Sequence, residues 1–314
     1  MTSPASSGRA ASEPAGFVPS YSEDLSHQVL GMIAQHRIVT NSLLLSVLLP
    51  GRRREQIARA LSKLRREEAA DFIVLPSSHG TRAWFLTERG AQLTRHLPQL
   101  RDRPAYPITS TSAASLRTAH TLTVVRAHAA FATSAHRRGD EHGPWDWTPE
   151  VAHNLGDGER VIADALMHYT HHTSDGQRIK FRAFVEVDRA TMSSERLAAK
   201  LIEYARFRIY EPQAVGGRRA RTDALGGPAW LRWYPAFPRI LFILTGAGPT
   251  ALGNRIDDLR AMVREHPTVA ALARDVPLGA AVLEDIETLG VDAPVWHCLR
   301  GSEGLEGLRP WTQL

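Results

Sequence analysis

Three carboxylates in the second half of the chain lie within apolar segments, at a spacing that could bind a metal ion. Residues 180–189 (KFRAFVEVDR) have the composition of a strand, and the strand period of two places Glu186 and Asp188 on one face. Asp164 lies in the middle of an earlier apolar segment, residues 161–169 (VIADALMHY). If the two segments are neighbouring strands, the three carboxylates converge.

Converging carboxylates repel one another, and each is costly to bury unless a cation neutralises it. Ligands that are all oxygen favour a hard ion, Mg²⁺ or Mn²⁺. Such an ion can activate a water molecule and stabilise the charge that builds on a phosphodiester. We therefore expect Asp164, Glu186 and Asp188 to be metal ligands at a catalytic site. The alternative is an edge strand whose carboxylates face solvent or pair with arginines.

The segments around these carboxylates predict an α/β domain with a mixed sheet over residues 112–314, because strands alternate with helices there. A long helix at about 113–138 is followed by a segment that leads into the sheet at 145–150. The elements expected after it are strands at 161–169, 180–189, 238–245, 280–283 and 295–299, helices at 193–210 and 253–266, and an inserted loop at 211–237.

The first hundred residues predict a separate unit. Residues 1–20 are rich in Pro, Ala, Ser and Gly, which is typical of a disordered tail. Residues 98–111 contain three prolines and read as a linker. Between them, residues 21–97 have the order of a winged helix-turn-helix domain: a helix near 25–33, a short helix at 40–49, a basic helix at 52–70, strands at 72–75 and 82–86, and a helix at 88–97.

Positive charge is concentrated in this first unit. Residues 1–103 contain 14 basic and 9 acidic residues, whereas residues 104–314 contain 24 of each. In a winged helix the third helix enters the major groove and the hairpin reaches the phosphates, so basic residues there bind DNA. The alternatives are a winged helix used for protein contacts and a basic face that only keeps the protein soluble. The residues expected to bind double-stranded DNA are Arg52, Arg53, Arg54, Arg59, Lys63 and Arg82.

Several short motifs, taken in order, resemble the replication-relaxation family of actinobacterial plasmids and integrated elements, which is similar to MobC-type conjugative relaxases. Asp164, followed about 20 residues later by Glu186 and Asp188, is also similar to the PD-(D/E)XK nuclease pattern, with an acid in place of its lysine. The family motifs are HTLTVV at 120–125, WxPE at 147–150, ADAL at 163–166, FVEVDRAT at 184–191 and the KxxxY of Lys200 and Tyr204.

The resemblance implies a restriction-endonuclease-like fold for the second domain and a role for each motif residue. Asp164 and Glu186 would be metal ligands, and Asp188 a third ligand or a base that positions water. Lys200 would supply the charge of the absent motif lysine from the next helix. Tyr204, one helical turn further, would contact a phosphate, act as a nucleophile or simply pack.

Other residues whose side chains could take part in catalysis or metal binding also have simple structural interpretations. Glu150 would complete the acidic cluster or end a strand. His120, on the apolar side of the long helix, reads as a structural histidine. The histidines at positions 168, 171 and 172 have no cysteine nearby and do not favour a zinc site.

Composition excludes several classes of protein. The longest apolar runs are too short to cross a membrane, and the first residues lack the apolar segment of a secretory signal. The single cysteine, Cys298, cannot form a disulfide within the chain. We therefore expect a cytoplasmic protein.

These features predict a two-domain protein of a mobile element. The winged helix would bind a site on duplex DNA, and the nuclease-like domain would nick or relax one strand with Mg²⁺ or Mn²⁺ during plasmid replication or conjugative transfer, with transfer or replication proteins as further partners. Hydrolysis and a covalent tyrosine intermediate both fit. One alternative is a non-catalytic regulator of plasmid replication or transcription with a degenerate nuclease fold, and another is a nuclease of defence.

Overall fold

A computed structural model describes residues 24–76, 78–100, 111–156, 158–212, 227–300 and 307–314. The predicted tail at residues 1–20, most of the predicted linker and the centre of the predicted inserted loop lie outside these ranges. No helix among the described residues is long and apolar enough to span a membrane.

The N-terminal part contains four helices and a three-stranded antiparallel sheet with the order β1-β3-β2. The helices begin at good capping residues: the side chains of Asp24, Thr40 and Thr87 accept backbone N–H groups of the first turns of α1, α2 and α4. The elements are α1 (Leu25–His36), β1 (Val39–Thr40), α2 (Asn41–Leu48), α3 (Glu55–Arg66), β2 (Ala70–Val74), β3 (Arg82–Leu86) and α4 (Glu88–Thr94), followed by a 3₁₀ turn at Pro98–Leu100.

The basic helix α3 is shorter than predicted. Its predicted apolar stripe of Ile57, Ala60, Leu61 and Leu64 is buried as expected. However, residues 52–54 form the turn before the helix, because the chain turns at Gly51, whose φ is 74°. At its other end the helix stops before Ala70, which already belongs to β2.

A seven-stranded mixed sheet forms the centre of the second part, with the order β10-β9-β8-β7-β6-β5-β4. Strands β4, β5 and β6 form an antiparallel meander, whereas β6, β7 and β8 run parallel. The strands are β4 (Trp147–Gly156), β5 (Glu159–His172), β6 (Arg178–Asp188), β7 (Arg239–Leu244), β8 (Leu278–Val282), β9 (Trp296–Cys298) and β10 (Leu308–Arg309). The predicted α/β class with a mixed sheet is confirmed.

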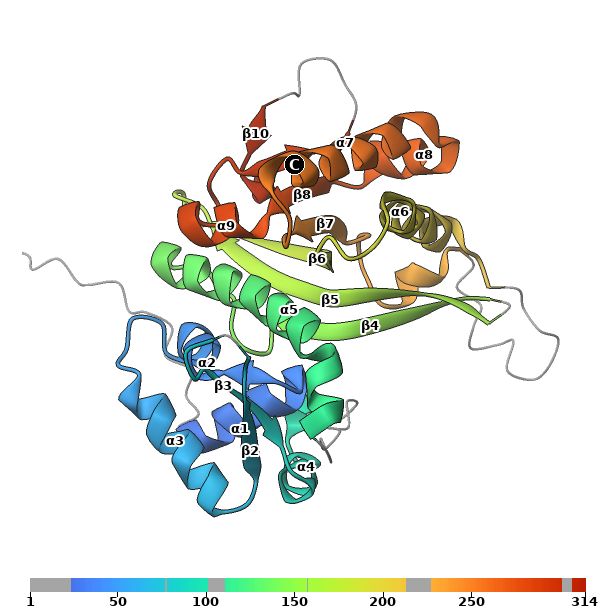
Figure 1. The fold of residues 1–314 in the computed structure, drawn as a ribbon. Helices are drawn as coiled ribbons and strands as arrows, with labels where there is room; N and C mark the ends of the chain where they lie inside the picture. The colour runs from blue at the N-terminus through green and yellow to red at the C-terminus, as the bar shows by residue number, and fades with distance from the viewer. Residues whose placement is uncertain (1–23, 77, 101–110, 157, 213–226, 301–306) are drawn as a thin grey trace, which may run out of the picture.

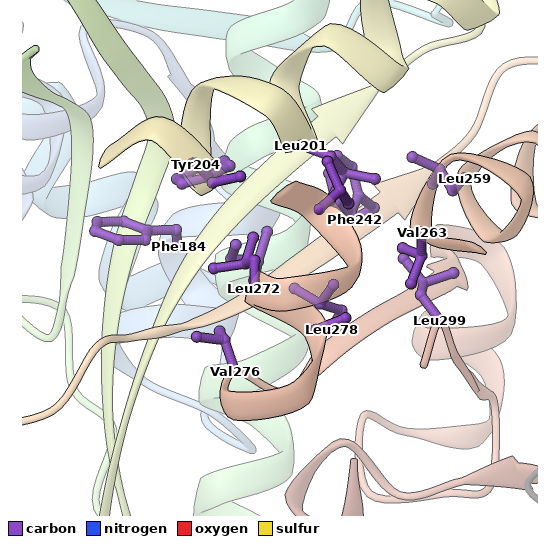
Figure 2. Packing of buried hydrophobic residues seen from close by; sticks show 14 of the residues in the cluster. Phe184, Leu201, Tyr204, Phe242, Leu259, Val263, Leu272, Val276, Leu278 and Leu299 are labelled. Carbon is purple, nitrogen blue, oxygen red and sulfur yellow. The ribbon is translucent and has the colours of Figure 1, made fainter. Parts of the chain in front are cut away.

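Helices cover both faces of this sheet (Figure 1). One face packs against α6 (Ser194–Ile209), α7 (Pro249–Glu265) and α8 (Pro267–Asp275). Figure 2 shows this core, in which Leu201 of α6, Phe242 of β7 and Leu259 of α7 meet. The opposite face packs against α5 (Thr111–Arg138) and α9 (Leu283–Leu289).

Helix α5 also joins the two parts of the chain, lying between the N-terminal elements and the sheet (Figure 1). Its Ala129 and Ala132 pack into the N-terminal core, and its His128 shares a 3.1 Å hydrogen bond with His36 of α1. Beside them, Arg37 forms a two-bond ion pair with Glu150 of β4, with N–O distances of 3.1 and 2.5 Å. The N-terminal part is thus docked directly on the first strand of the large sheet.

Candidate active site

The predicted site begins at an irregularity in β5. Ala163 packs in the core beneath α6 and Ala165 in the core beneath α5, although residues two apart in a regular strand share a face. The register with the partner strand β4 is unbroken here, since Pro149 pairs with Ala165 and Val151 with Ala163, but Glu150, which lies opposite Asp164, has a φ of 52°. The alternation of β5 therefore shifts at Asp164.

This shift turns the Asp164 carboxylate into the gap where β5 and β6 separate. The paired register of the two strands ends at Ala165 and Val185. Beyond that point the Asp164 side chain replaces the backbone ladder, because its Oδ2 accepts the N–H of Val187 at 2.7 Å. Its Oδ1 lies 3.1 Å from Nε2 of His120 on α5. Asp164 is thus held between the two strands by three elements.

Glu186 lies on the neighbouring strand and is only 3% exposed. The hydroxyl of Tyr204 donates a 2.6 Å hydrogen bond to its Oε1, and Nζ of Lys200 lies 3.4 Å from the same atom. Lys200 also donates to the carbonyl of Ile162 on β5 at 2.6 Å. Both side chains come from α6, which begins after Ser193, whose hydroxyl caps its first turn.

The pKa values of the site residues are shifted by burial and by their neighbours. Burial raises the pKa of Glu186 to about 8, and the nearby negative charge of Asp164 adds to this rise, while Lys200 and the Tyr204 hydroxyl oppose it. Burial and the Glu186 carboxyl raise the pKa of Tyr204. The hydrogen bond to Asp164 raises the pKa of His120.

Asp188, the third predicted ligand, has a different partner. Its Oδ2 accepts a 2.6 Å hydrogen bond from Arg255 of α7, which also donates to the carbonyl of Met192 at 2.5 Å. Asp188 is 1% exposed, and its Oδ1 is buried with no hydrogen-bond partner among the described residues. The structure therefore brings Asp164, Glu186, Lys200 and Tyr204 together and joins Asp188 to an arginine that sequence reasoning missed.

The donor set of the site suits a hard cation. Asp164 and Glu186 supply carboxylate oxygens from adjacent strands, close enough for each charge to affect the other. Within the described ranges, no group of three or more His, Cys, Asp or Glu side chains is arranged to hold a metal ion. A third ligand role for Asp188 would require release of its contact with Arg255, and it stays a prediction.

The profile of the family described as replication-relaxation matches residues 30–217, which is more than half of the chain. The chain belongs to the replication-relaxation family. This family suggests a role in the replication of plasmids or mobile elements. Neither a curated protein nor a solved structure matches the chain. The replication-relaxation match includes Asp164, Glu186, Lys200 and Tyr204, and ends before Arg255.

The remaining sequence candidates have other partners. Glu150 binds Arg37, and so ties the N-terminal part to the sheet beside Asp164. His120, interpreted from the sequence as structural, hydrogen-bonds Asp164; its place as the first residue of the HTLTVV motif was the signal for a role at the site. His171 and His172 lie beside Asp140 and Glu141 at 3.1 and 2.8 Å.

The predicted DNA-binding residues lie on α3, on the turn before it and on β3. Those at positions 52–54 and Arg59 are exposed. Lys63 forms a 2.8 Å ion pair with Asp24, and the Arg82 guanidinium stacks on the ring of Phe72, 4.4 Å from its centre. Arg65 stacks on the same ring at 4.6 Å and is a basic residue of this surface that was not among the predicted contacts.

Proposed function

We propose that this replication-relaxation protein binds duplex DNA and nicks one strand of it with the help of Mg²⁺ or Mn²⁺, during replication or conjugative transfer of a plasmid or mobile element. The observation that carries the proposal is the pair Asp164 and Glu186, flanked by Lys200 and Tyr204, at the separation of β5 and β6. These four side chains supply acids and a cation to a single point, as cleavage of a phosphodiester requires.

The arrangement agrees with a PD-(D/E)XK nuclease-like fold. Its first acid lies on one strand of an antiparallel meander and its second acid on the next strand. Lys200 reaches Glu186 from the following helix, so the positive charge is retained although the motif position itself carries Asp188. The order of the elements therefore supports the proposal that Lys200 takes the place of the motif lysine.

Asp164 and Glu186 are the residues that would hold the metal ion, which when bound would activate water and stabilise the charge on the phosphate. Lys200 would oppose the rise that burial causes in the pKa of Glu186 and would offer a positive charge to the DNA backbone. Tyr204 would orient Glu186 through its 2.6 Å hydrogen bond. A fully buried tyrosine hydroxyl with a raised pKa is a poor nucleophile, so the orienting role is favoured over a covalent one.

The N-terminal part would bind the duplex as a winged helix. Helix α3 presents an exposed basic face, and the hairpin of β2 and β3 would form the wing that reaches the backbone. The arginines at positions 52–54 lie in the turn at the start of α3, where the first residues of a recognition helix meet DNA.

The test is incubation of the purified full chain with supercoiled plasmid of its own element, in Mg²⁺, in Mn²⁺ or in EDTA. Open circles that need the metal and disappear in Asp164→Asn and Glu186→Gln would support the proposal. Glu265→Gln is the matched control, because this exposed carboxylate of α7 lies outside the site. Equal nicking by wild type and both site variants would overturn the assignment of the carboxylates.

A second candidate is a non-catalytic regulator of plasmid replication or transcription that retains the nuclease-like fold. It is favoured by two observations: both oxygens of Asp164 already accept or share hydrogen bonds, and Asp188 is neutralised by Arg255. This candidate predicts salt-sensitive plasmid binding without open circles. Under it, substitution of residues 52–54 removes function and substitution of Asp164 does not.

A further inference from the structure

A large cavity lies between the N-terminal hairpin and the edge of the main sheet. Its volume is about 1320 Å³. It is lined by the end of β2 and the loop after it, one face of α5, the connections that follow β6, β7 and β8, the first half of α7, and His297 of β9. Pockets for small molecules usually measure about 300–1,000 Å³. The cavity is therefore large enough for a ligand longer than one small molecule.

The topology of the sheet creates this cavity. Strands β7 and β8 are parallel neighbours, and their carboxyl ends lie at the same edge. The chain leaves β7 toward α7 on one face and leaves β8 toward α9 on the other. Connections that diverge in this way open a crevice at the carboxyl ends of parallel strands, which is where α/β sheets bind ligands. Both connections line the cavity.

The walls of the cavity are mainly aliphatic, with Leu75 and Pro76 from the hairpin, Leu122 from α5, and Leu252 and Val282 from the sheet side. Aliphatic walls at the surface of a basic protein need a partner with both apolar and charged parts. The rim also carries charge of both signs, since Arg126, Arg189, Glu284 and Asp285 line it as well.

Within the described residues, only one of these two arginines has no hydrogen-bond or ion-pair partner. Arg126 is held by Glu287 through hydrogen bonds of 2.8 and 2.7 Å. Arg189 has no hydrogen-bond or ion-pair partner in the part of the chain that the structure describes, and it directly follows Asp188 at the end of β6. Its charge acts on His120, the side chain that holds Asp164. Arg189 thus lines the cavity and lies near enough to His120 for its charge to lower the pKa of that histidine.

We propose that this cavity holds unpaired nucleotides of the DNA strand that passes the carboxylate pair, with bases against the aliphatic walls and a phosphate on Arg189. The inference rests on the proposed function, whose substrate it specifies as locally single-stranded DNA. In duplex DNA the faces of the bases are stacked on one another, so the walls of a cavity contact base faces only when the strand is unpaired. The charge of Arg189 favours a strand over an uncharged apolar peptide.

The duplex and the single strand would then bind at different places on the same protein. The basic surface of α3 would hold the duplex, and the cavity would hold the strand released from it. The cavity contacts the hairpin through Ile73 of β2 and Leu75 of the loop after it, and the same hairpin carries Arg82 of the basic surface.

The test measures fluorescence anisotropy of a labelled oligothymidylate of about ten nucleotides and of a labelled hairpin duplex, with the full chain in EDTA so that nothing is cleaved. Ala119→Trp fills the cavity from an exposed position of α5, and Arg189→Gln removes the charge. Ala251→Trp is the matched control, because Ala251 is an exposed helical alanine of α7 that does not line the cavity.

We expect both cavity variants to bind the single strand at least about tenfold more weakly, while the control and the duplex affinity stay at the wild-type value. Single-strand binding that is equal in wild type and both cavity variants would overturn the proposal, as would an oligomer that binds no more tightly than thymidine 5′-monophosphate. Strand binding that depends on the cavity in a protein without nicking activity would remove the proposed nicking function and leave the strand site standing. Nicking with no strand binding in the cavity would remove the strand site and leave the proposed nicking function standing.

Discussion

Replacement of Glu186 by glutamine should change how the stability of the protein depends on pH. The glutamine keeps the size of the side chain and an oxygen that can accept the Tyr204 hydroxyl, but it cannot ionise. In the wild-type protein burial raises the pKa of Glu186 to about 8, from the 4.5 that is ordinary for a glutamate. The folded protein therefore keeps a proton that the unfolded chain releases.

The sign and size of the effect follow from this difference. A raised pKa stabilises the fold below the unfolded value, and this stability is lost as the pH rises from about 4.5 through about 8. One pKa unit corresponds to about 1.4 kcal/mol, so the loss between pH 5 and pH 8 is roughly 3 kcal/mol. Glu186→Gln removes this term, and its free energy of unfolding relative to wild type should rise by that amount over the same range.

Urea unfolding of both proteins in EDTA at pH 5, 6.5 and 8 measures the difference. Glu265→Gln is the control, because an exposed carboxyl should leave the pH dependence of wild type unchanged. Addition of Mg²⁺ at pH 8 should then stabilise wild type more than Glu186→Gln, since only the carboxylate binds the ion well. Parallel pH profiles for wild type and Glu186→Gln would refute the reasoning, because the carboxyl would then not be protonated in the fold.

Three further predictions concern the rest of the molecule. Replacing the arginines at residues 52–54 by glutamine should weaken duplex binding and lower the slope of log affinity against log salt by about 3, as measured in a salt titration. Arg255→Ala should destabilise the fold by about 3–5 kcal/mol, because Asp188 is left buried and unpaired; Arg260→Ala, whose partner Asp257 is exposed, should cost at most about 1 kcal/mol in the same urea titration. Tyr204→Phe should retain nicking, with its pH profile moved to higher pH. The Tyr204 hydroxyl lowers the pKa of Glu186, so this pKa rises when the hydrogen bond is removed. Complete loss of nicking at every pH would point instead to a covalent role for Tyr204.

Much of the local structure could be predicted from the sequence. The strand at residues 180–189 and its alternation follow from the apolar pattern, and the observed β6 (Arg178–Asp188) agrees closely. The apolar stripe of α3 was also correct, but its start was not, because a helical pattern continued through the turn at residues 52–54. The start of α7 was predicted too late, near residue 253, whereas the helix begins at Pro249. The proline and glycine there suggested a loop, although proline is common in the first turn of a helix.

The candidate site could be predicted only in part. Asp164, Glu186, Lys200 and Tyr204 were named from their spacing and from the resemblance to a family, and the structure brings them together. Pairing of a carboxylate with an arginine was the alternative drawn from the sequence, but nothing in the sequence identified Arg255 as the partner of Asp188, because the two residues lie 67 positions apart in the chain.

The sequence by itself therefore determined features that depend on residues close together in the chain. These are most of the strands and helices, the shared face of Glu186 and Asp188, and the excess of basic residues in the first third of the chain. Tertiary structure decided which charges are paired and which remain free. It shifted the alternation of β5 at Asp164, turned His120 toward that carboxylate and placed Arg189 beside a cavity with no partner among the described residues. The physical reason is that burial and long-range contacts set the state of a charge, and these depend on which segments meet in space.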